Sequence, residues 1–82
     1  MYRNKNADGT LNISGIRIAS LRKQLNPKTS QKALADKLQL CGLDLDKNAI
    51  QRIESGKRFV TDIELLVFSE VLNVSITSLL EK

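Results

Sequence analysis

Residues 47–52 place a set of hydrogen-bonding side chains on one side of a short predicted helix. At about 100° per residue, four polar side chains fall within an arc of about 140°: Lys47, Asn48, Gln51 and Arg52. The apolar residues of the stretch fall on the opposite side: Ala49, Ile50 and Ile53. Lys and Arg donate hydrogen bonds to phosphates and to guanine, and Asn and Gln can pair with adenine through two hydrogen bonds. The polar arc holds no carboxylate. It therefore has the side chains that a helix in the major groove of DNA needs, although a solvated basic face would have the same composition.

The preceding stretch, "SQKALADKL", predicts a helix that could also approach a phosphate. Gln31 stands at its start, where free backbone N–H groups favour an anion. The small side chain of Ala35 would let another helix approach closely. Together the two stretches favour contact with a polyanion over a merely solvated face.

The charge of the chain is unevenly distributed along the sequence. The net charge is +4, but residues 1–60 hold twelve Lys and Arg against five Asp and Glu, which gives +7. Residues 61–82 hold one Lys against four Asp and Glu, which gives −3. A basic body with an acidic end suits a partner that is polyanionic on one side only.

The composition indicates neither an enzyme nor a membrane protein. The chain has no histidine, no metal-ligand cluster and no glycine-rich phosphate loop, so we expect no catalysis, cofactor or small-molecule ligand. The acids Asp44 and Asp46 are better explained as a loop acid and a helix cap. No stretch approaches the roughly 18 apolar residues of a spanning helix, and "MYRNKNADGTLN" lacks the apolar core of a secretory signal. We therefore expect a cytoplasmic location, with the single Cys41 as a small buried residue rather than a redox switch.

Apolar residues recur at helical spacing, and no stretch shows the sustained alternation of a strand. The sequence therefore predicts a single all-α domain with five helices, at about residues 13–25, 30–40, 47–55, 61–72 and 75–82. Predicted N-terminal caps are Asn12, Thr29 or Ser30, Asp46, and Thr61 with Glu64 as its capping-box partner. Predicted ends are marked by Pro27, Gly42, Gly56 and Asn73. Across the first cap, Leu11 is placed to pack against Ile16.

Three stretches, "TSQKALADKL", "NAIQRIESGKR" and "LLVFSEVLNVSITSLL", resemble the phage repressor and Cro type of helix-turn-helix proteins, the XRE-like family. The resemblance extends over residues 16–80, nearly the whole chain. It implies a repressor-like domain that binds double-stranded DNA and regulates transcription. In that case the protein would be a repressor acting by steric occlusion, as a homodimer on a roughly palindromic operator.

The resemblance also implies roles for individual residues. The third helix would be the recognition helix, with base contacts from Lys47, Asn48, Gln51 and Arg52. Phosphate contacts would come from Gln31, Ser55, Lys57 and Arg58. A structural ion pair would join Arg22 in the first helix to Glu54 at the end of the third. Arg22 flanks an apolar stripe, which agrees with a partly buried pair, and the alternative is two unrelated surface charges.

The sequence departs from the family pattern in its links. "NPKT" makes the link between the first two helices about two residues longer. Ala35 and Ile50 are fifteen positions apart, about five more than in the compact motif, so the turn 41–46 between the second and third helices is lengthened. We expect Leu43 and Leu45 in this turn to be buried, since two exposed leucines would be unfavourable. The family pattern does not determine the angle at which such a turn presents the recognition helix.

Two regions outside the recognition helix receive expectations of their own. Residues 1–12 are expected to form a flexible basic N-terminal arm, and residues 13–82 to form the helix-turn-helix domain. The alternative for the arm is that Arg3 and Lys5 enter a minor groove of DNA. The last helix is expected to build the homodimer through Ile76, Leu79 and Leu80. The alternative is that this helix only covers the core of the monomer.

The runner-up function is a protein–protein interaction module of the same fold, such as an antitoxin or an anti-regulator. The carboxylate-free face of the third helix favours DNA over this alternative. An RNA-binding or bridging role is disfavoured, because the chain has only three aromatic residues for base stacking: Tyr2, Phe59 and Phe68.

Overall fold

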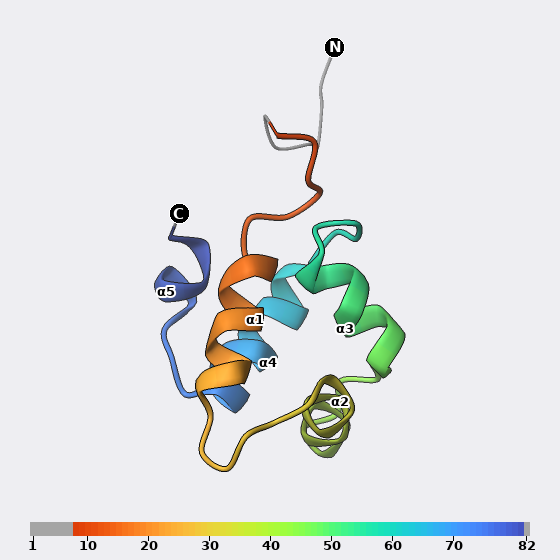
Figure 1. Ribbon diagram of the computed structural model, residues 1–82, viewed down its shortest axis with the longest axis vertical. Coiled ribbons are helices and arrows are strands. Elements are labelled where there is room, and N and C mark those ends of the chain that lie inside the picture. Colours follow the sequence, from red (N-terminus) through yellow and green to blue (C-terminus); the bar gives the residue numbers. More distant parts are fainter. Residues whose placement is uncertain (1–7, 82) are drawn as a thin grey trace.

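A computed structural model describes residues 8–81, and within them the backbone forms five helices and no strand. The helices are α1 Gly15–Gln24, α2 Gln31–Leu40, α3 Lys47–Glu54, α4 Asp62–Leu72 and α5 Ile76–Leu80. The helix α1 contacts α3, α4 and α5, so it stands at the centre of the fold, with α3 and α5 on opposite sides (Figure 1). The predicted all-α architecture is confirmed, while Arg3 and Lys5 of the expected arm lie outside the described residues.

Side-chain caps define where α2, α3 and α4 begin. The Ser30 hydroxyl accepts a hydrogen bond from the Ala33 N–H at 3.0 Å, and the Asp46 carboxylate accepts one from the Ala49 N–H at 2.8 Å. Thr61 and Glu64 form the predicted capping box at the start of α4. Each cap satisfies backbone donors that have no partner in the first turn, which stabilises these helices by about 1 kcal/mol apiece.

Three of the four residues predicted to mark helix ends, Gly42, Gly56 and Asn73, have positive φ angles of 87°, 78° and 56°. Each lies just beyond a helix whose last carbonyls accept backbone N–H groups from the turn. After α3, for example, the Lys57 N–H donates to the Arg52 oxygen at 2.8 Å and the Gly56 N–H to the Ile53 oxygen at 3.1 Å. Glycine adopts this left-handed conformation without strain, and asparagine is the other residue often found in it at helix ends, so these residues favour the ends observed.

The start of α1 differs from the prediction. The helix begins at Gly15 rather than near residue 13, so Ser14 stands at the N-cap and the predicted N-cap Asn12 is wrong. The side-chain oxygen of Asn12 nevertheless accepts the Gly15 N–H at 2.7 Å. The side chain of Ile16 is 77% exposed, so the predicted packing of Leu11 against Ile16 is wrong. The rotation of α1 is set by its contacts with α3, α4 and α5, and these turn Ile16 towards solvent.

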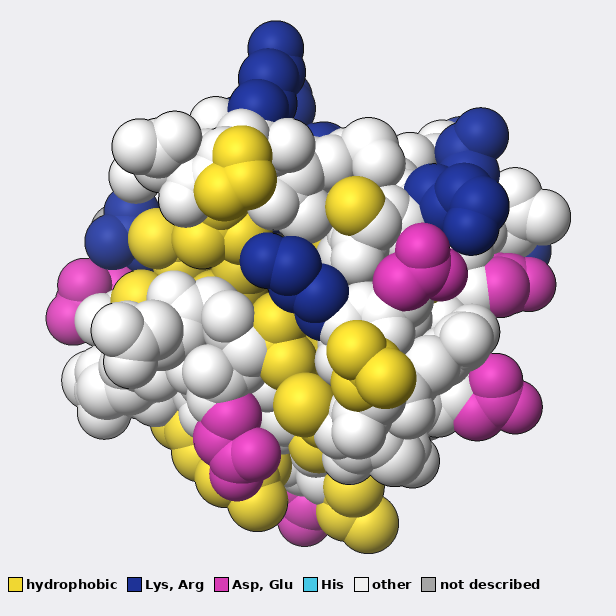
Figure 2. Space-filling model, turned by 90° about the horizontal axis from the view of Figure 1, so that it is seen from below, with side chains coloured by type: hydrophobic (Ala, Val, Ile, Leu, Met, Phe, Trp, Pro, Cys, Tyr) yellow, Lys and Arg dark blue, Asp and Glu magenta, His cyan; other side chains and the backbone are white. Residues whose placement is uncertain are grey.

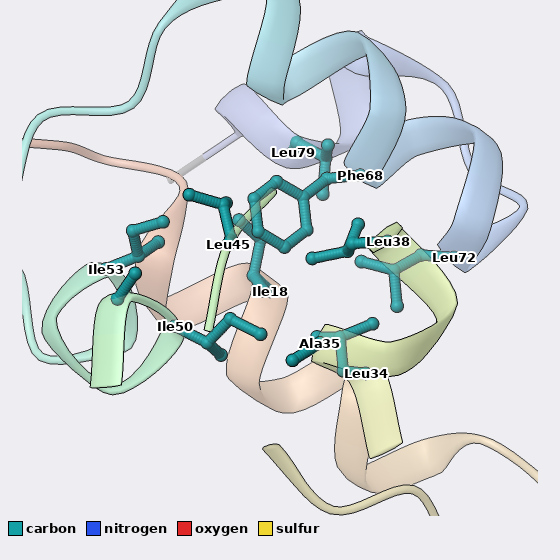
Figure 3. Packing of buried hydrophobic residues seen from close by; sticks show 11 residues of the cluster. Ile18, Leu34, Ala35, Leu38, Leu45, Ile50, Ile53, Phe68, Leu72 and Leu79 are labelled. Carbon is teal, nitrogen blue, oxygen red and sulfur yellow. The ribbon is translucent and has the colours of Figure 1, made fainter. Parts of the chain in front are cut away.

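The hydrophobic core draws on all five helices (Figure 3). Its fully buried large side chains are Ile18, Leu34, Leu38, Ile50, Ile53, Phe68 and Leu79. The Phe68 ring lies among side chains from α1, α2 and α5 in Figure 3. Burial of each such side chain contributes about 1.5–3 kcal/mol, so α3 is held to the domain mainly through Ile50 and Ile53.

The lengthened turn 41–46 is packed against the domain. Leu45 is 5% exposed and belongs to the core, and Leu43 is half-buried against it, as expected from the sequence. Cys41 is exposed, so its predicted burial is wrong. The helix α2 ends at Leu40 and the chain turns at Gly42, and it is Leu43 and Leu45 beyond this turn that pack against the core, while Cys41 stays at the surface.

The side of the molecule seen in Figure 2 carries Lys and Arg together with Asp and Glu, and hydrophobic side chains show between them. This view is from below Figure 1, so it does not look directly onto the outer side of α3. Both signs of charge are interspersed there, which is the ordinary condition of a solvated surface. No helix among residues 8–81 is long and apolar enough to cross a membrane.

Candidate nucleic-acid interface

The outer side of α3 carries the four side chains that the sequence predicted as base contacts. Lys47, Asn48, Gln51 and Arg52 are all exposed. On the inner side, Ala49, Ile50 and Ile53 are 7%, 0% and 0% exposed. The helix is therefore anchored on one side and presents its polar groups on the other, as the spacing of the residues indicated.

None of these four side chains has a hydrogen-bonding or ionic partner elsewhere in the described part of the chain. Lys47 and Arg52 contribute two positive charges, and Asn48 and Gln51 each contribute an amide NH2 group that donates and an amide oxygen that accepts. The absence of internal partners leaves all of these groups available to a ligand. Their chemistry suits phosphate oxygens and base edges, as the sequence predicted.

Three of the predicted phosphate contacts lie near the C-terminal end of α3. Ser55 and Lys57 are exposed directly after the helix, and the Lys57 ammonium has no partner within residues 8–81. Gln31 is half-buried at the start of α2, and its amide nitrogen donates to the Glu54 carboxylate at 2.9 Å. The structure brings Gln31 to the end of α3, so three of these residues border the same helix.

Arg22 and Glu54 form a nearly buried ion pair between α1 and α3. The Arg22 Nε and Nη2 atoms donate to the two Glu54 oxygens at 2.7 and 3.0 Å, and Nη1 donates to the Thr29 carbonyl oxygen at 3.0 Å. The side chains are only 11% and 8% exposed. The hydrogen bonds to Glu54 raise the pKa of Arg22 above its ordinary value, although burial opposes this. Each charge is thus satisfied, which is the condition under which a buried pair is tolerated.

A second ion pair, which the sequence did not predict, engages Arg58. Its two terminal nitrogens donate to the two Glu64 oxygens at 2.9 Å each. Hydrogen bonding by Arg58 lowers the pKa of Glu64, against the raising effect of burial, and the Thr61 N–H lowers it further. The capping-box spacing predicted that Glu64 accepts the Thr61 N–H at the start of α4. It did not indicate that the same carboxylate would form an ion pair with Arg58.

Because the Arg58 charge is already matched by Glu64, Arg58 is less available to a phosphate than Lys57 is. The sequence placed the two residues in the same role, since both follow α3 and both are basic. The structure gives them different surroundings. The Arg58 side chain contacts Glu64 in the first turn of α4, whereas the Lys57 side chain faces solvent.

Sequence reasoning also missed a set of contacts to the end of α3. The segment before α1 reaches this end, where the Asn12 amide nitrogen donates to the Ile53 and Arg58 carbonyl oxygens at 3.1 and 2.7 Å. The only sequence signal at Asn12 was its position as a predicted helix cap, and that signal indicated contacts with the first turn of α1 but none with α3. Among residues 8–81 there is no group of three or more His, Cys, Asp or Glu that could hold a metal ion.

A protein-family model described as helix-turn-helix matches residues 18–79. The match begins within α1 and ends within α5, so it includes the exposed face of α3 and both ion pairs. No curated protein and no solved structure matches the chain.

Proposed function

Because the chain belongs to the helix-turn-helix family of the Cro and C1 type, whose members bind DNA and regulate transcription, we propose that it is a sequence-specific repressor. Proteins of this family are typically not enzymes. In the proposed mechanism, the protein binds its operator as a homodimer and blocks access to the DNA by occupying it. Phosphate contacts supply affinity and register, and base contacts supply preference for a sequence.

The observation that carries this proposal is the outer face of α3. Its four polar side chains are exposed and have no partners in the described chain, while the inner face is held by the core. An exposed face that contained carboxylates would repel DNA, and this face contains none. We assign base contacts to Lys47, Asn48, Gln51 and Arg52 on this ground.

Phosphate contacts are assigned to Gln31, Ser55 and Lys57, with Arg58 in a secondary role. Gln31 stands in the first turn of α2, where backbone donors also favour a phosphate. Its hydrogen bond to Glu54 orients the side chain and leaves the amide oxygen and one N–H unused. Lys57 offers a full charge without an internal partner, whereas Arg58 would have to share its charge with Glu64.

The proposed dimer uses the apolar side chains that α5 does not bury in its own core. Leu79, which the sequence assigned to the dimer, is fully buried in the core of its own domain, so that assignment is wrong. Ile76 and Leu80 are 37% and 43% exposed. On helix α4, Leu66 is also 48% exposed. Exposed apolar groups of this kind are stabilised when a second copy covers them, and the alternative, in which α5 only caps the monomer, accounts for Leu79 alone.

Selection from a pool of randomised DNA duplexes tests the function directly. We expect the protein to enrich a roughly palindromic sequence and to bind it at least about 1,000-fold more tightly than random duplex, with an affinity that falls as salt rises. Binding that is salt-dependent but equal on all sequences would contradict sequence recognition. No binding at low salt would instead favour a protein–protein module of the same fold.

A further inference from the structure

The segment that precedes α1 is fastened to the C-terminal end of α3 by three hydrogen bonds. The Leu11 N–H donates to the Gly56 carbonyl oxygen at 2.8 Å. The side-chain amide of Asn12 donates to the carbonyl oxygens of Ile53 at 3.1 Å and Arg58 at 2.7 Å. Figure 1 shows this segment beside the loop that follows α3, although the two are more than forty positions apart along the chain.

Close packing at Gly15 brings α1 near enough for these bonds to form. Gly15 is buried, and a Cβ atom at this position would collide with the Ile53 carbonyl oxygen. The same Gly15 donates its N–H to the side-chain amide oxygen Oδ1 of Asn12 at 2.7 Å. Asn12 thus makes two separate sets of contacts with its two amide atoms. The oxygen makes a capping contact with the first N–H of α1 from two positions before the Ser14 N-cap, and the nitrogen holds the end of α3.

The bonds from Asn12 fall on the part of the chain that carries the proposed phosphate contacts. Ile53 is in the last turn of α3, and Arg58 closes the loop 55–58 that contains Ser55 and Lys57. By linking both carbonyls, one side chain fixes the loop to the helix.

We propose that Asn12 is a positioning residue for DNA recognition. Its amide nitrogen holds the end of α3 and the loop 55–58 in one orientation relative to α1, so that the base-contacting side chains and Lys57 meet the duplex in a single register. This inference rests on the proposed function, because a register has meaning only when DNA is bound.

Two substitutions separate the positioning task from the capping task. Asn12→Asp keeps an oxygen for the Gly15 N–H but has no N–H to donate, so a carboxylate would face the Ile53 and Arg58 carbonyl oxygens. Asn12→Ser keeps a capping oxygen on a shorter side chain that does not extend to those carbonyls. Val71→Ala is the matched control, since it removes half-buried apolar volume from α4, outside the Asn12 contacts.

The experiment uses the full chain and a duplex that the wild-type protein selects from a randomised pool. Affinities for the selected and for random duplex are measured over a salt series, at a temperature where every variant is folded. We expect the ratio of the two affinities to fall about tenfold or more in Asn12→Asp and Asn12→Ser, with binding to random duplex and its salt slope nearly unchanged. Val71→Ala should lose thermal stability and keep the ratio.

Hydrogen exchange supplies a second readout that does not depend on DNA. The Lys57 N–H, which donates to the Arg52 oxygen, should exchange faster in both Asn12 variants than in Val71→Ala of equal stability. An unchanged affinity ratio in both Asn12 variants would overturn the inference and leave Asn12 as a helix cap. A wild-type chain that selects no sequence would overturn the proposed function, and this inference with it.

Discussion

Arg22 of α1 and Glu54 of α3 join the two helices through a two-pronged ion pair, with Nε 2.7 Å from Oε2 and Nη2 3.0 Å from Oε1. The same two side chains also bond to the link between α1 and α2 and to the start of α2. Arg22 donates to the Thr29 carbonyl oxygen, and the Glu54 carboxylate accepts a hydrogen bond from the Gln31 amide. One carboxylate at the end of α3 therefore connects α1, the start of α2 and the proposed phosphate-binding amide. This arrangement means that the interface and the stability of the domain depend on the same side chains.

Loss of Arg22 should destabilise the domain severely. Arg22→Met leaves the Glu54 carboxylate nearly buried with Gln31 as its remaining side-chain partner, and we expect a loss of about 3 kcal/mol in the free energy of unfolding by urea denaturation. The double variant Arg22→Met with Glu54→Leu should recover most of that loss, because no unpaired charge remains. Equal instability of the single and double variants would contradict a role for the unpaired charge.

The ion pair between Arg58 and Glu64 should make stability depend on pH in the acid range. The pKa of Glu64 is lowered in the folded chain below its ordinary value of 4.5, first by hydrogen bonding from Arg58. A carboxyl group of this kind stabilises the folded state above its unfolded pKa, and the contribution is lost as the pH falls through the lower, folded pKa.

We therefore expect the wild-type free energy of unfolding to fall more steeply below pH 4.5 than that of Glu64→Gln, which keeps an acceptor for the Thr61 N–H. Urea denaturation at a series of pH values from neutral to acid measures this difference. Parallel curves for the two proteins would show that Glu64 does not contribute to the pH dependence.

Arg52 on the outer face of α3 should contribute to sequence preference. With Arg52→Ala, we expect relaxed preference at one or two operator positions and a cost of about 1–3 kcal/mol in binding the selected duplex. Competition among duplexes with single base changes measures this effect. Equal weakening on every sequence would instead make Arg52 a phosphate contact.

Lys57 and Arg58 should respond differently to substitution although they are neighbours with the same charge. Lys57→Ala should weaken binding to all duplexes and lower the slope of log K against log salt by about 1, because its ammonium has no internal partner. Arg58→Ala should change the slope less and reduce stability more, since it leaves the buried Glu64 carboxylate unpaired. Equal slopes in the two variants would contradict the secondary role assigned to Arg58.

The association state should depend on the exposed side chains of α5. We expect Leu80→Glu to shift the protein towards monomer in sedimentation velocity, because a carboxylate would replace a 43% exposed leucine at the proposed interface. Leu40→Glu is the matched control, since Leu40 is 88% exposed on α2 and should tolerate the charge. If wild-type protein sediments as a monomer at every concentration, the homodimer is wrong.

The sequence by itself determined the five helices, most of their ends and the two sides of α3. These features depend on neighbours in the chain: the spacing of Ile50 and Ile53 sets the buried side, and the residues Asp46 and Gly56 set the ends. The sequence also predicted the burial of Leu45, although Leu40 is 88% exposed, so residue type alone does not decide which leucines are buried.

Tertiary structure alone decided which side chains remain available to a partner. Arg58 and Lys57 have the same local sequence signals, and only the position of Glu64 across the loop distinguishes them. The same holds for Asn12, whose amide meets carbonyls more than forty residues away, and for Ile16 and Cys41, whose exposure follows from how α1 and α2 are packed. Periodicity and cap signals report contacts within a few residues, whereas the partner of a hydrogen bond or an ion pair depends on the relative placement of whole helices, which the packed core determines.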